Sequence, residues 1–497
     1  MIRLEVEYLL FNSAHFFVYF PIVIAIYFLM PHRFRWVFLL GASYYFYMAW
    51  KPEYILLIIL TTCVDYTLCI FMGREKEKSK RKKYLYMSLF VNLGLLLLFK
   101  YFNFLNGTFR EIFINFNMAY NIPDFSLLLP MGISFYTFQT MSYTIDVYKG
   151  RREPEKHLGI FALYISFFPQ LVAGPIERSE KLLPQFREKH TFNYERVTDG
   201  LKRMLWGFFK KMVIADRLSI LVEYVYGPNL YNLEGFPLIL GTVFFAFQIY
   251  CDFSAYSDIA IGAAKVMGFD LMENFKSPYF SKSINEFWKR WHISLSSWFK
   301  DYVYIPLGGN RVSIPRHYFN LFVTFLVSGI WHGANWTFVA WGALHGFYLV
   351  CGVFFSKTKK SIVKTLGLNK VPVIHNLLRI SMTFSLVCFA WIFFVAKSFS
   401  DALYVIRHMF VGLGKMVSFE YIKTTALSLG LNQTSMLVAL FALVVLFIVE
   451  LIQRKGSVIE RLKNKPVVIR WACYYFLIIM IMAFGVYGQN NFIYFQF

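Results

Sequence analysis

Long apolar stretches separated by short polar segments run along most of the chain. A helix that crosses the hydrocarbon core of a bilayer needs about 20 mostly apolar residues. Windows of this kind lie at 16–31, 36–50, 53–72, 84–105, 127–147, 204–222, 236–255, 317–333, 337–355, 377–396, 435–452 and 470–488. Two shorter apolar pieces, 158–173 and 284–300, are typical of re-entrant or interfacial helices. The pattern predicts an all-α polytopic membrane protein with about 11 or 12 transmembrane helices.

Composition agrees with this pattern. Residues of the AVILMFWYC set make up 57% of the 497 residues, and charged residues make up 16%, whereas an ordinary soluble domain is about a quarter charged. A large water-soluble enzyme is therefore excluded. The net charge of +22 does not indicate nucleic-acid binding, because the basic residues lie between apolar runs rather than along one face of a helix.

Basic residues gather in alternate loops, at 33–35, 74–83, 149–156, 178–211, 357–379 and 454–470. The intervening loops, such as 103–125 and 223–235, are poor in lysine and arginine. An excess of these residues marks the cytoplasmic side. We therefore expect a multi-pass protein of the bacterial inner (plasma) membrane with an extracytoplasmic N-terminus. The first apolar run has no basic region before it and no cleavage site, so we expect a retained span rather than a signal peptide.

Two histidines stand out within apolar sequence. His332 lies in SGIWHGANW and His292 in NEFWKRWHISLSSW. A neutral imidazole can take a proton from a hydroxyl group and pass it on, and the small residues Gly329, Gly333 and Ala334 are expected to leave room for a ligand beside His332. A purely structural histidine near a membrane face is an equally good interpretation at this point.

A metal site is the competing interpretation. His292, His332 and His345 would supply three nitrogen ligands, and Asp252 and Asp258 in QIYCDFSAYSDIAIG would complete the set or, equally, form hydrogen bonds between spans. No HExxH pattern accompanies them, and the six cysteines are scattered without a CxxC pair. We therefore expect no metal and no disulfide framework.

Other familiar motifs are weak or missing. The PLGGNR turn at 306–311 would aim backbone N–H groups and Arg311 at a phosphate, but a plain interfacial turn explains it equally well. The chain has no G-x-S-x-G elbow, Walker loop or GxGxxG. The H-x4-D motif of glycerolipid acyltransferases is also absent, because the positions five residues after the two histidines are Ser297 and Thr337.

Five segments in order resemble one family. SGIWHGANWTFVAWGALHG around His332 resembles the invariant-histidine motif of the membrane-bound O-acyltransferase (MBOAT) family, and FWKRWHISLSSWFKDYVYIPLGGNR resembles its upstream histidine motif. QIYCDFSAYSDIAIG, FYTFQTMSYTIDVYKG and FFPQLVAGPIER are similar to the bacterial AlgI-like and DltB-like branch of alginate O-acetyltransferases and D-alanyl transferases. The resemblance runs through nearly the whole chain.

The resemblance implies an MBOAT funnel fold with a thin central barrier at the invariant histidine. It implies a single MBOAT transmembrane domain over 1–497, with N-terminal spans in 1–125, a catalytic core in 126–355 and C-terminal spans in 356–497. His332 would be the main catalytic residue and His292 the second, with Asp252 and Asp258 as supporting polar residues. The lining of the donor side would include Asn285, Trp288, Arg290, Trp291, Asp301, Trp331 and Asn335.

The C-terminal tail, GVYGQNNFIYFQF, adds one more resemblance. FIYFQF resembles the end of the small tyrosine-bearing peptide that works beside DltB-type transferases. This implies that Tyr494 is an acyl relay. A phenol has a pKa near 10 and loses its proton more readily than a sugar hydroxyl. The alternative is an aromatic anchor at the membrane interface.

The implied function is O-acetylation of an extracellular or cell-envelope polysaccharide, such as an alginate-like exopolysaccharide. Acetyl-CoA would be the donor substrate, with no bound cofactor, and an extracytoplasmic SGNH or esterase-like partner would complete the transfer. One alternative is a D-alanyl transferase for teichoic acid, which an acetyl-CoA requirement would exclude. The other is a polysaccharide transporter with structural histidines, which loss of activity in a folded His332→Ala variant would exclude.

Overall fold

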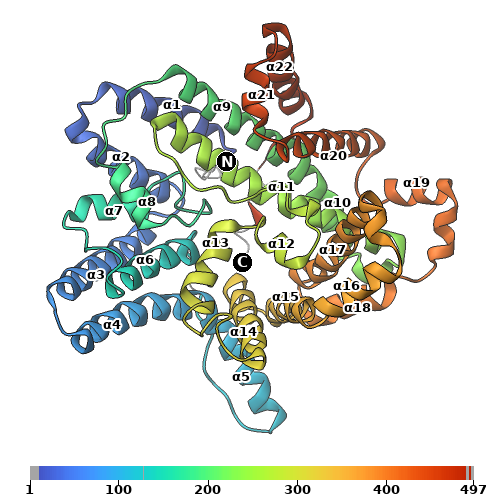
Figure 1. Ribbon diagram of the computed structural model, residues 1–497, viewed down its shortest axis with the longest axis horizontal. Coiled ribbons are helices and arrows are strands. Elements are labelled where there is room, and N and C mark those ends of the chain that lie inside the picture. Colours follow the sequence, from blue (N-terminus) through green and yellow to red (C-terminus); the bar gives the residue numbers. More distant parts are fainter. Residues whose placement is uncertain (1–10, 127, 489–491, 494–497) are drawn as a thin grey trace, which may run out of the picture. The chain divides into compact units, whose positions relative to one another are not determined.

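The computed structural model describes residues 11–126, 128–488 and 492–493, and every regular element within these ranges is a helix (Figure 1). The all-α prediction is therefore confirmed. The described residues form two compact units. The first contains 11–204 and 256–272, and the second contains 205–255 and 273–493. Helices α9 and α11 each contribute to both units.

The first unit holds the N-terminal helices. They are α1 (Ala14–Leu29), α2 (His32–Met48), η1 (Pro52–Tyr54), α3 (Ile55–Arg74), α4 (Lys78–Leu96), η2 (Leu97–Tyr101), α5 (Phe102–Asn115), α6 (Ile133–Tyr148), α7 (Leu158–Ser166), α8 (Ser179–Gln185) and most of α9 (Tyr194–Phe208).

The second unit holds the rest. It begins with η3 (Phe209–Ala215), α10 (Asp216–Tyr226), η4 (Leu230–Asn232), the first part of α11 (Phe236–Met267), η5 (Pro278–Phe280), α12 (Ile284–Trp288), α13 (Ile293–Phe299) and η6 (Lys300–Tyr304). It continues with α14 (Ile314–His332), α15 (Trp336–Phe354), α16 (Ser356–Thr365), η7 (Leu368–Lys370), α17 (Pro372–Val395), α18 (Phe399–His408), η8 (Leu413–Val417), α19 (Phe419–Leu427), α20 (Gln433–Gln453), α21 (Val458–Lys463) and α22 (Val467–Phe484).

The predicted spans coincide with helices. Each apolar window overlaps an α-helix, and the two shorter pieces correspond to the short helices α7, α12 and α13. Among the described residues, 7 helical stretches are long and apolar enough to cross a membrane: 52–74, 78–115, 236–267, 336–354, 372–395, 433–453 and 467–484. Other windows form helices that are shorter, such as the 16-residue α1, or interrupted, or less apolar, such as the 19-residue α14. The chain is thus a multi-pass membrane protein.

A buried polar cluster joins α3, α4 and α6 within the first unit. The Asp65 carboxylate accepts hydrogen bonds from Ser88 Oγ and, at 2.8 Å, from Asn92 Nδ2. Thr140 Oγ1 of α6 lies 3.5 Å from Asn92 Oδ1. Because a buried carboxylate is costly without donors, these contacts fix how the three apolar helices pack.

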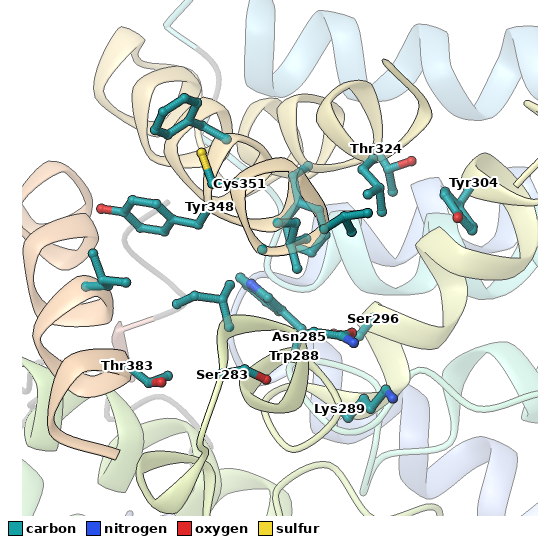
Figure 2. A pocket seen from close by; sticks show the side chains of 18 of the residues that line it. Ser283, Asn285, Trp288, Lys289, Ser296, Tyr304, Thr324, Tyr348, Cys351 and Thr383 are labelled. Atoms are coloured by element: carbon teal, nitrogen blue, oxygen red, sulfur yellow. The ribbon is translucent and has the colours of Figure 1, made fainter. Parts of the chain in front are cut away.

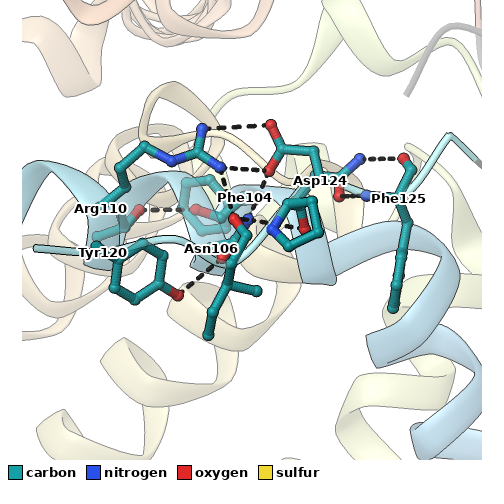
Figure 3. Close-up of polar contacts among 10 residues, drawn as sticks. Phe104, Asn106, Arg110, Tyr120, Asp124 and Phe125 are labelled. Atoms are coloured by element: carbon teal, nitrogen blue, oxygen red, sulfur yellow. Dashed lines mark hydrogen bonds and ion pairs between the residues drawn. The ribbon is translucent and has the colours of Figure 1, made fainter.

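The segment after α5 folds back onto that helix (Figure 3). Arg110 Nη2 lies 3.2 Å from Asp124 Oδ1, and Asn106 Nδ2 donates to the same oxygen at 2.6 Å. Tyr120 donates to Asn106 Oδ1 at 2.7 Å, and the Phe125 N–H donates to Asn103 Oδ1 at 2.8 Å. This network shapes the 116–125 connection before α6.

Close packing of α14 against α15 organises the second unit around the predicted histidines. A Cβ atom on Gly342 would lie 2.5 Å from the Phe325 carbonyl oxygen and 2.8 Å from Gly329 Cα. Gly342 and Gly346 have the GxxxG spacing that lets helices in membranes approach closely. The glycines therefore seat the end of α14, which carries His332, directly against α15.

Candidate active site

His332 is the last residue of α14 and is buried, with 4% of its surface exposed. Its ring centroid lies 5.0 Å from that of Trp331, 4.8 Å from that of Trp341 and 5.6 Å from that of Phe394. These rings come from α14, α15 and α17. The arrangement holds the imidazole in an aromatic box that excludes bulk water.

The glycines near His332 have a different role from the predicted one. A Cβ atom on Gly333 would lie 2.2 Å from the ring of Phe338, and one on Gly329 would lie 2.4 Å from the Phe338 carbonyl oxygen. The space beside both glycines is filled by α15. The expectation that these two residues leave room for a ligand is therefore wrong, because they allow close helix packing instead.

His292 occupies the residue before α13 in a left-handed backbone conformation, with φ 42° and ψ 57°. A non-glycine residue held there costs about 1–3 kcal/mol and persists only when its surroundings enforce it. Asn274 supplies the enforcement: its carbonyl oxygen accepts from the Ile293 N–H at 3.0 Å, and its Oδ1 accepts from the Ser294 hydroxyl at 3.0 Å and the Ser294 N–H at 3.2 Å. Asn274 is a site residue that the sequence did not indicate.

The His292 ring is fully buried. Its centroid lies 4.5 Å from that of Phe253, with the rings nearly perpendicular, and 6.3 Å from that of Trp331. His292 belongs to none of the membrane-spanning stretches, and burial lowers its pKa well below the ordinary value. The imidazole is therefore neutral near pH 7, as a proton acceptor must be.

The structure brings the three predicted histidines into one group, with tryptophan rings between them. Trp331 lies between His292 and His332, at centroid distances of 6.3 and 5.0 Å. Trp341 lies between His332 and His345, at 4.8 and 4.9 Å. Among the described residues, no group of three or more His, Cys, Asp or Glu side chains is placed to hold a metal ion. Trp341 was part of a motif, but nothing in its spacing singled it out.

Trp288 closes this group from α12. Its Nε1–H donates to His345 Nδ1 at 3.2 Å, and the two ring centroids lie 5.0 Å apart. His345 is fully buried. The hydrogen bond fixes which imidazole nitrogen accepts, so His345 orients Trp288 at a cavity wall.

The two predicted supporting aspartates belong to different ion pairs. Asp258 lies 2.9 Å from Arg203 within the first unit. Asp252 lies 2.7 Å from Lys211 within the second unit. Each joins α11 to another helical segment, so the alternative of contacts between spans describes them.

A cavity of about 1130 Å³ opens between α12, α13, η6, α14, α15 and α17 (Figure 2). Asn285 and Trp288, two predicted lining residues, lie on its wall together with Tyr348 and Thr383. Ser328, one helical turn before His332, also lines it. The cavity carries basic side chains, namely Lys282, Lys289, Lys300, Lys359 and Arg379.

Other predicted lining residues are not on this wall as far as the structure describes it. Arg290 forms an ion pair with Glu286 at 2.7 Å. Trp291 is buried, with its ring centroid 5.2 Å from that of Trp391. Asn335 caps α15, since its Oδ1 accepts from the Thr337 N–H at 3.0 Å.

Asp301 lies half-buried in η6, and Trp331 is buried against His332. In the PLGGNR turn, Asn310 lines the cavity, whereas Arg311 is exposed outside the lining. Asn320 Nδ2 donates to the Gly309 carbonyl oxygen at 2.9 Å, which holds this turn against α14.

The motifs FYTFQTMSYTIDVYKG and FFPQLVAGPIER contact a common partner in the first unit. Gln139 and Gln170 both donate to the Tyr164 carbonyl oxygen, at 2.6 and 2.9 Å. Glu177 accepts from the Met272 N–H at 2.6 Å, and burial raises the pKa of this carboxyl to about 7. These contacts give the motifs a structural role.

Tyr494, the predicted relay, lies outside the described residues.

The described residues thus form an all-helical, multi-pass fold in which a buried histidine ends α14, one helical turn after a residue of a cavity that carries basic side chains. The family model described as MBOAT, membrane-bound O-acyltransferase family, matches residues 157–396. The chain is 38% identical over 432 residues to a Pseudomonas aeruginosa protein named "Probable alginate O-acetylase AlgI", covering 86% of this chain and 80% of the relative. The chain belongs to the MBOAT family and is an acyltransferase.

Two further relatives carry related names. The chain is 34% identical over 444 residues to the "Peptidoglycan O-acetyltransferase" of Helicobacter pylori, covering 82% of this chain and 81% of the relative. It is 29% identical over 299 residues to the "Teichoic acid D-alanyltransferase" of Bacillus subtilis, covering 56% of this chain and 71% of the relative. The family predicted from the five motifs is therefore confirmed.

Proposed function

We propose that the protein transfers acetyl groups from cytoplasmic acetyl-CoA for O-acetylation of a cell-envelope polysaccharide, such as an alginate-like exopolysaccharide. The observation that carries the proposal is the position of His332, buried among aromatic rings one helical turn after the cavity residue Ser328. The similarity to relatives named O-acetylase or O-acetyltransferase, over more than four fifths of the chain, supports acetyl as the group transferred.

The basic cavity supports a CoA thioester as donor. Its volume of about 1130 Å³ is slightly above the range of ordinary ligand pockets, about 300–1,000 Å³, which suits a large ligand. Lysine and arginine attract phosphates, and the CoA moiety carries several. Lys359 and Arg379 belong to the 357–379 segment, whose basic residues predict the cytoplasmic side.

The chemistry requires one base and one attacking hydroxyl. His332 accepts the proton of the acceptor hydroxyl while its oxygen attacks the thioester carbonyl carbon. The new C–O bond forms, the C–S bond breaks, and the CoA sulfur leaves as a thiolate that takes up a proton. General-base assistance of this kind is worth about 10²–10⁴-fold in rate. His292, held neutral and buried next to Trp331, is the second histidine of the site.

The first acceptor in this proposal is Tyr494. Its phenol forms an aryl acetate, which retains much of the transfer potential of the thioester. An extracytoplasmic SGNH or esterase-like partner then passes the acetyl group to a polysaccharide hydroxyl.

The test uses purified full-length protein incubated with acetyl-CoA and a peptide mass map of the C-terminal tail. Wild type, His332→Ala and the control His375→Ala are run in parallel. We expect acetyl on Tyr494 in wild type and in the control, and none in His332→Ala. Acetyl in none of them removes the relay and leads to tests of direct transfer and of a D-alanyl donor. Equal acetyl in all three overturns the role of His332.

A further inference from the structure

We propose that a buried ion cluster of Lys211, Asp216 and Asp252 is the docking site for the chain's own C-terminal segment, and that Asp252 is a positioning residue for the residue that follows Ile493. The proposal rests on the proposed function insofar as that residue, Tyr494, accepts the acetyl group. The docking itself is independent of that chemistry.

The cluster is compact and buried within the second unit. Lys211 Nζ lies 2.7 Å from Asp252 Oδ1 and 2.8 Å from Asp216 Oδ1. The exposed fractions of Lys211, Asp216 and Asp252 are 1, 3 and 3%. One ammonium group thus faces two carboxylates away from water. Such a group is costly unless further donors satisfy the carboxylate oxygens.

The C-terminal segment supplies the further donor. The Ile493 N–H donates to Asp252 Oδ2 at 2.6 Å, so the Asp252 carboxylate joins Lys211 on one oxygen to the tail backbone on the other. The Phe492 ring centroid lies 4.3 Å from Lys211 Nζ, a distance at which a ring attracts a cation. Phe492 and Ile493 are 1 and 6% exposed. The tail therefore enters the protein interior at the ion cluster.

A second set of contacts holds the start of the tail. The Val486 N–H donates to the Met212 carbonyl oxygen at 2.9 Å, and Arg217 Nη2 donates to the Phe484 carbonyl oxygen. Met212 lies in η3, a π-helix. In a π-helix the hydrogen bonds run to i+5 rather than i+4, and such irregular turns occur frequently at functional sites. One stretch of chain, 211–217, thus contacts the tail both where the tail leaves α22 and where Phe492 lies against Lys211.

The same turn of α11 reaches the candidate active site. Asp252 binds the tail, and the next residue, Phe253, packs on His292 with ring centroids 4.5 Å apart. Because consecutive Cα atoms are about 3.8 Å apart, docking of Ile493 restrains Tyr494 to the reach of one residue. An acceptor restrained in this way reacts as part of the same molecule, which raises its effective concentration.

The first experiment measures docking without acetyl transfer. Full-length protein in detergent is digested with carboxypeptidase, and the C-terminus is followed by intact mass. We expect digestion of wild type to stop when it reaches Ile493. Asp252→Asn and Phe492→Ala should lose Ile493 and the residues that precede it at least about tenfold faster, because a hydrogen bond or a cation–ring contact to the cluster is weakened. Phe492→Ala leaves the buried charges unchanged, so it keeps the test valid if Asp252→Asn folds poorly.

Asp65→Asn is the matched control. Asp65 is a fully buried acid of α3 that accepts hydrogen bonds from Ser88 and Asn92 of α4 within the first unit, whereas the ion cluster and Ile493 belong to the second. Asp65→Asn should resist digestion as wild type does. If wild type is trimmed through Phe492 as fast as the variants, or if Asp65→Asn is trimmed as fast as Asp252→Asn, the docking proposal is overturned.

The second experiment separates docking from the relay. Acetyl on Tyr494 is measured after incubation with acetyl-CoA. We expect about tenfold less in Asp252→Asn than in wild type at equal protein concentration and equal folded fraction. A tail that is released but acetylated at the wild-type rate overturns the positioning role. A wild-type tail that resists digestion but never carries acetyl overturns the relay of the proposed function and leaves docking intact.

Discussion

Gly329 of α14 and Gly342 of α15 pack against each other so closely that a Cβ atom on Gly342 would lie 2.8 Å from Gly329 Cα. His332 follows Gly329 by three residues, and Trp341, which packs on the His332 ring, precedes Gly342 by one. The glycine contact therefore sets the distance between the imidazole and the indole that forms one wall of its box.

Gly342→Ala should disturb this distance. The added methyl group meets backbone atoms of α14, and overpacking of this kind costs about 1–3 kcal/mol. We expect a lower unfolding temperature and at least about tenfold less acetyl transfer, since α14 must move away from α15. Gly94→Ala is the control, because a Cβ atom on Gly94 of α4 would meet no neighbouring segment within 4 Å. Equal effects of the two substitutions would contradict a special role for the contact.

The role of His332 as a base predicts a pH dependence. His332→Ala should lose about 10²–10⁴-fold in acetyl transfer while folding normally. In wild type the rate should fall below roughly pH 6, because an imidazole base that has taken up a proton cannot accept another. Initial rates from pH 5 to 8 with acetyl-CoA in excess measure this. A flat profile down to pH 5 argues against a histidine base.

His292 predicts a pH dependence of stability rather than of rate. Burial lowers its pKa in the folded protein, while the unfolded chain takes up the proton near pH 6.5. Below that pH the unfolded state binds more protons, so stability is lost as pH falls, by up to about 1.4 kcal/mol per pH unit. Unfolding temperatures at pH 7.5 and 5.5 should therefore differ more in wild type than in His292→Asn.

Asn is the suitable replacement because it tolerates positive φ better than other non-glycine residues. It keeps the left-handed backbone at position 292 and removes the titrating group. If wild type and His292→Asn lose the same amount of stability between the two pH values, other groups carry the acid sensitivity.

The membrane-spanning helices could be predicted from the sequence because each contains about 20 adjacent, mostly apolar residues, as in α17 and α20. The motifs single out the histidines as candidates, and the fold brings all three into one group. The position of Asn274 could not, because its importance depends on a contact with Ser294, 20 residues away. The prediction for the glycines is wrong for the same reason: a small residue such as Gly333 predicts room for a ligand, but the Phe338 ring fills that space in the fold.

Asp252 shows a similar limit. Its residue type and apolar surroundings marked it as a supporting residue, but its partners Lys211 and Ile493 lie 41 and 241 residues away. No local pattern encodes such distant partners. The sequence therefore predicted a polar residue of interest, and only the fold shows that it binds the tail.

The basic residues of the cavity predict a specific kinetic change. Lys289 and Lys359 are exposed lysines of its lining. If they attract CoA phosphates, the double variant Lys289→Ala/Lys359→Ala should raise the KM for acetyl-CoA about 2–30-fold and leave kcat nearly unchanged, because each exposed charge contributes about 0.2–1 kcal/mol. Lys80→Ala is the control, since Lys80 of α4 pairs with Glu77, the residue before that helix, outside the cavity. Higher salt should reduce the difference between wild type and the double variant, because salt screens exposed charges. A KM that stays at the wild-type value, or a fall in kcat alone, would show that the donor's phosphates bind elsewhere.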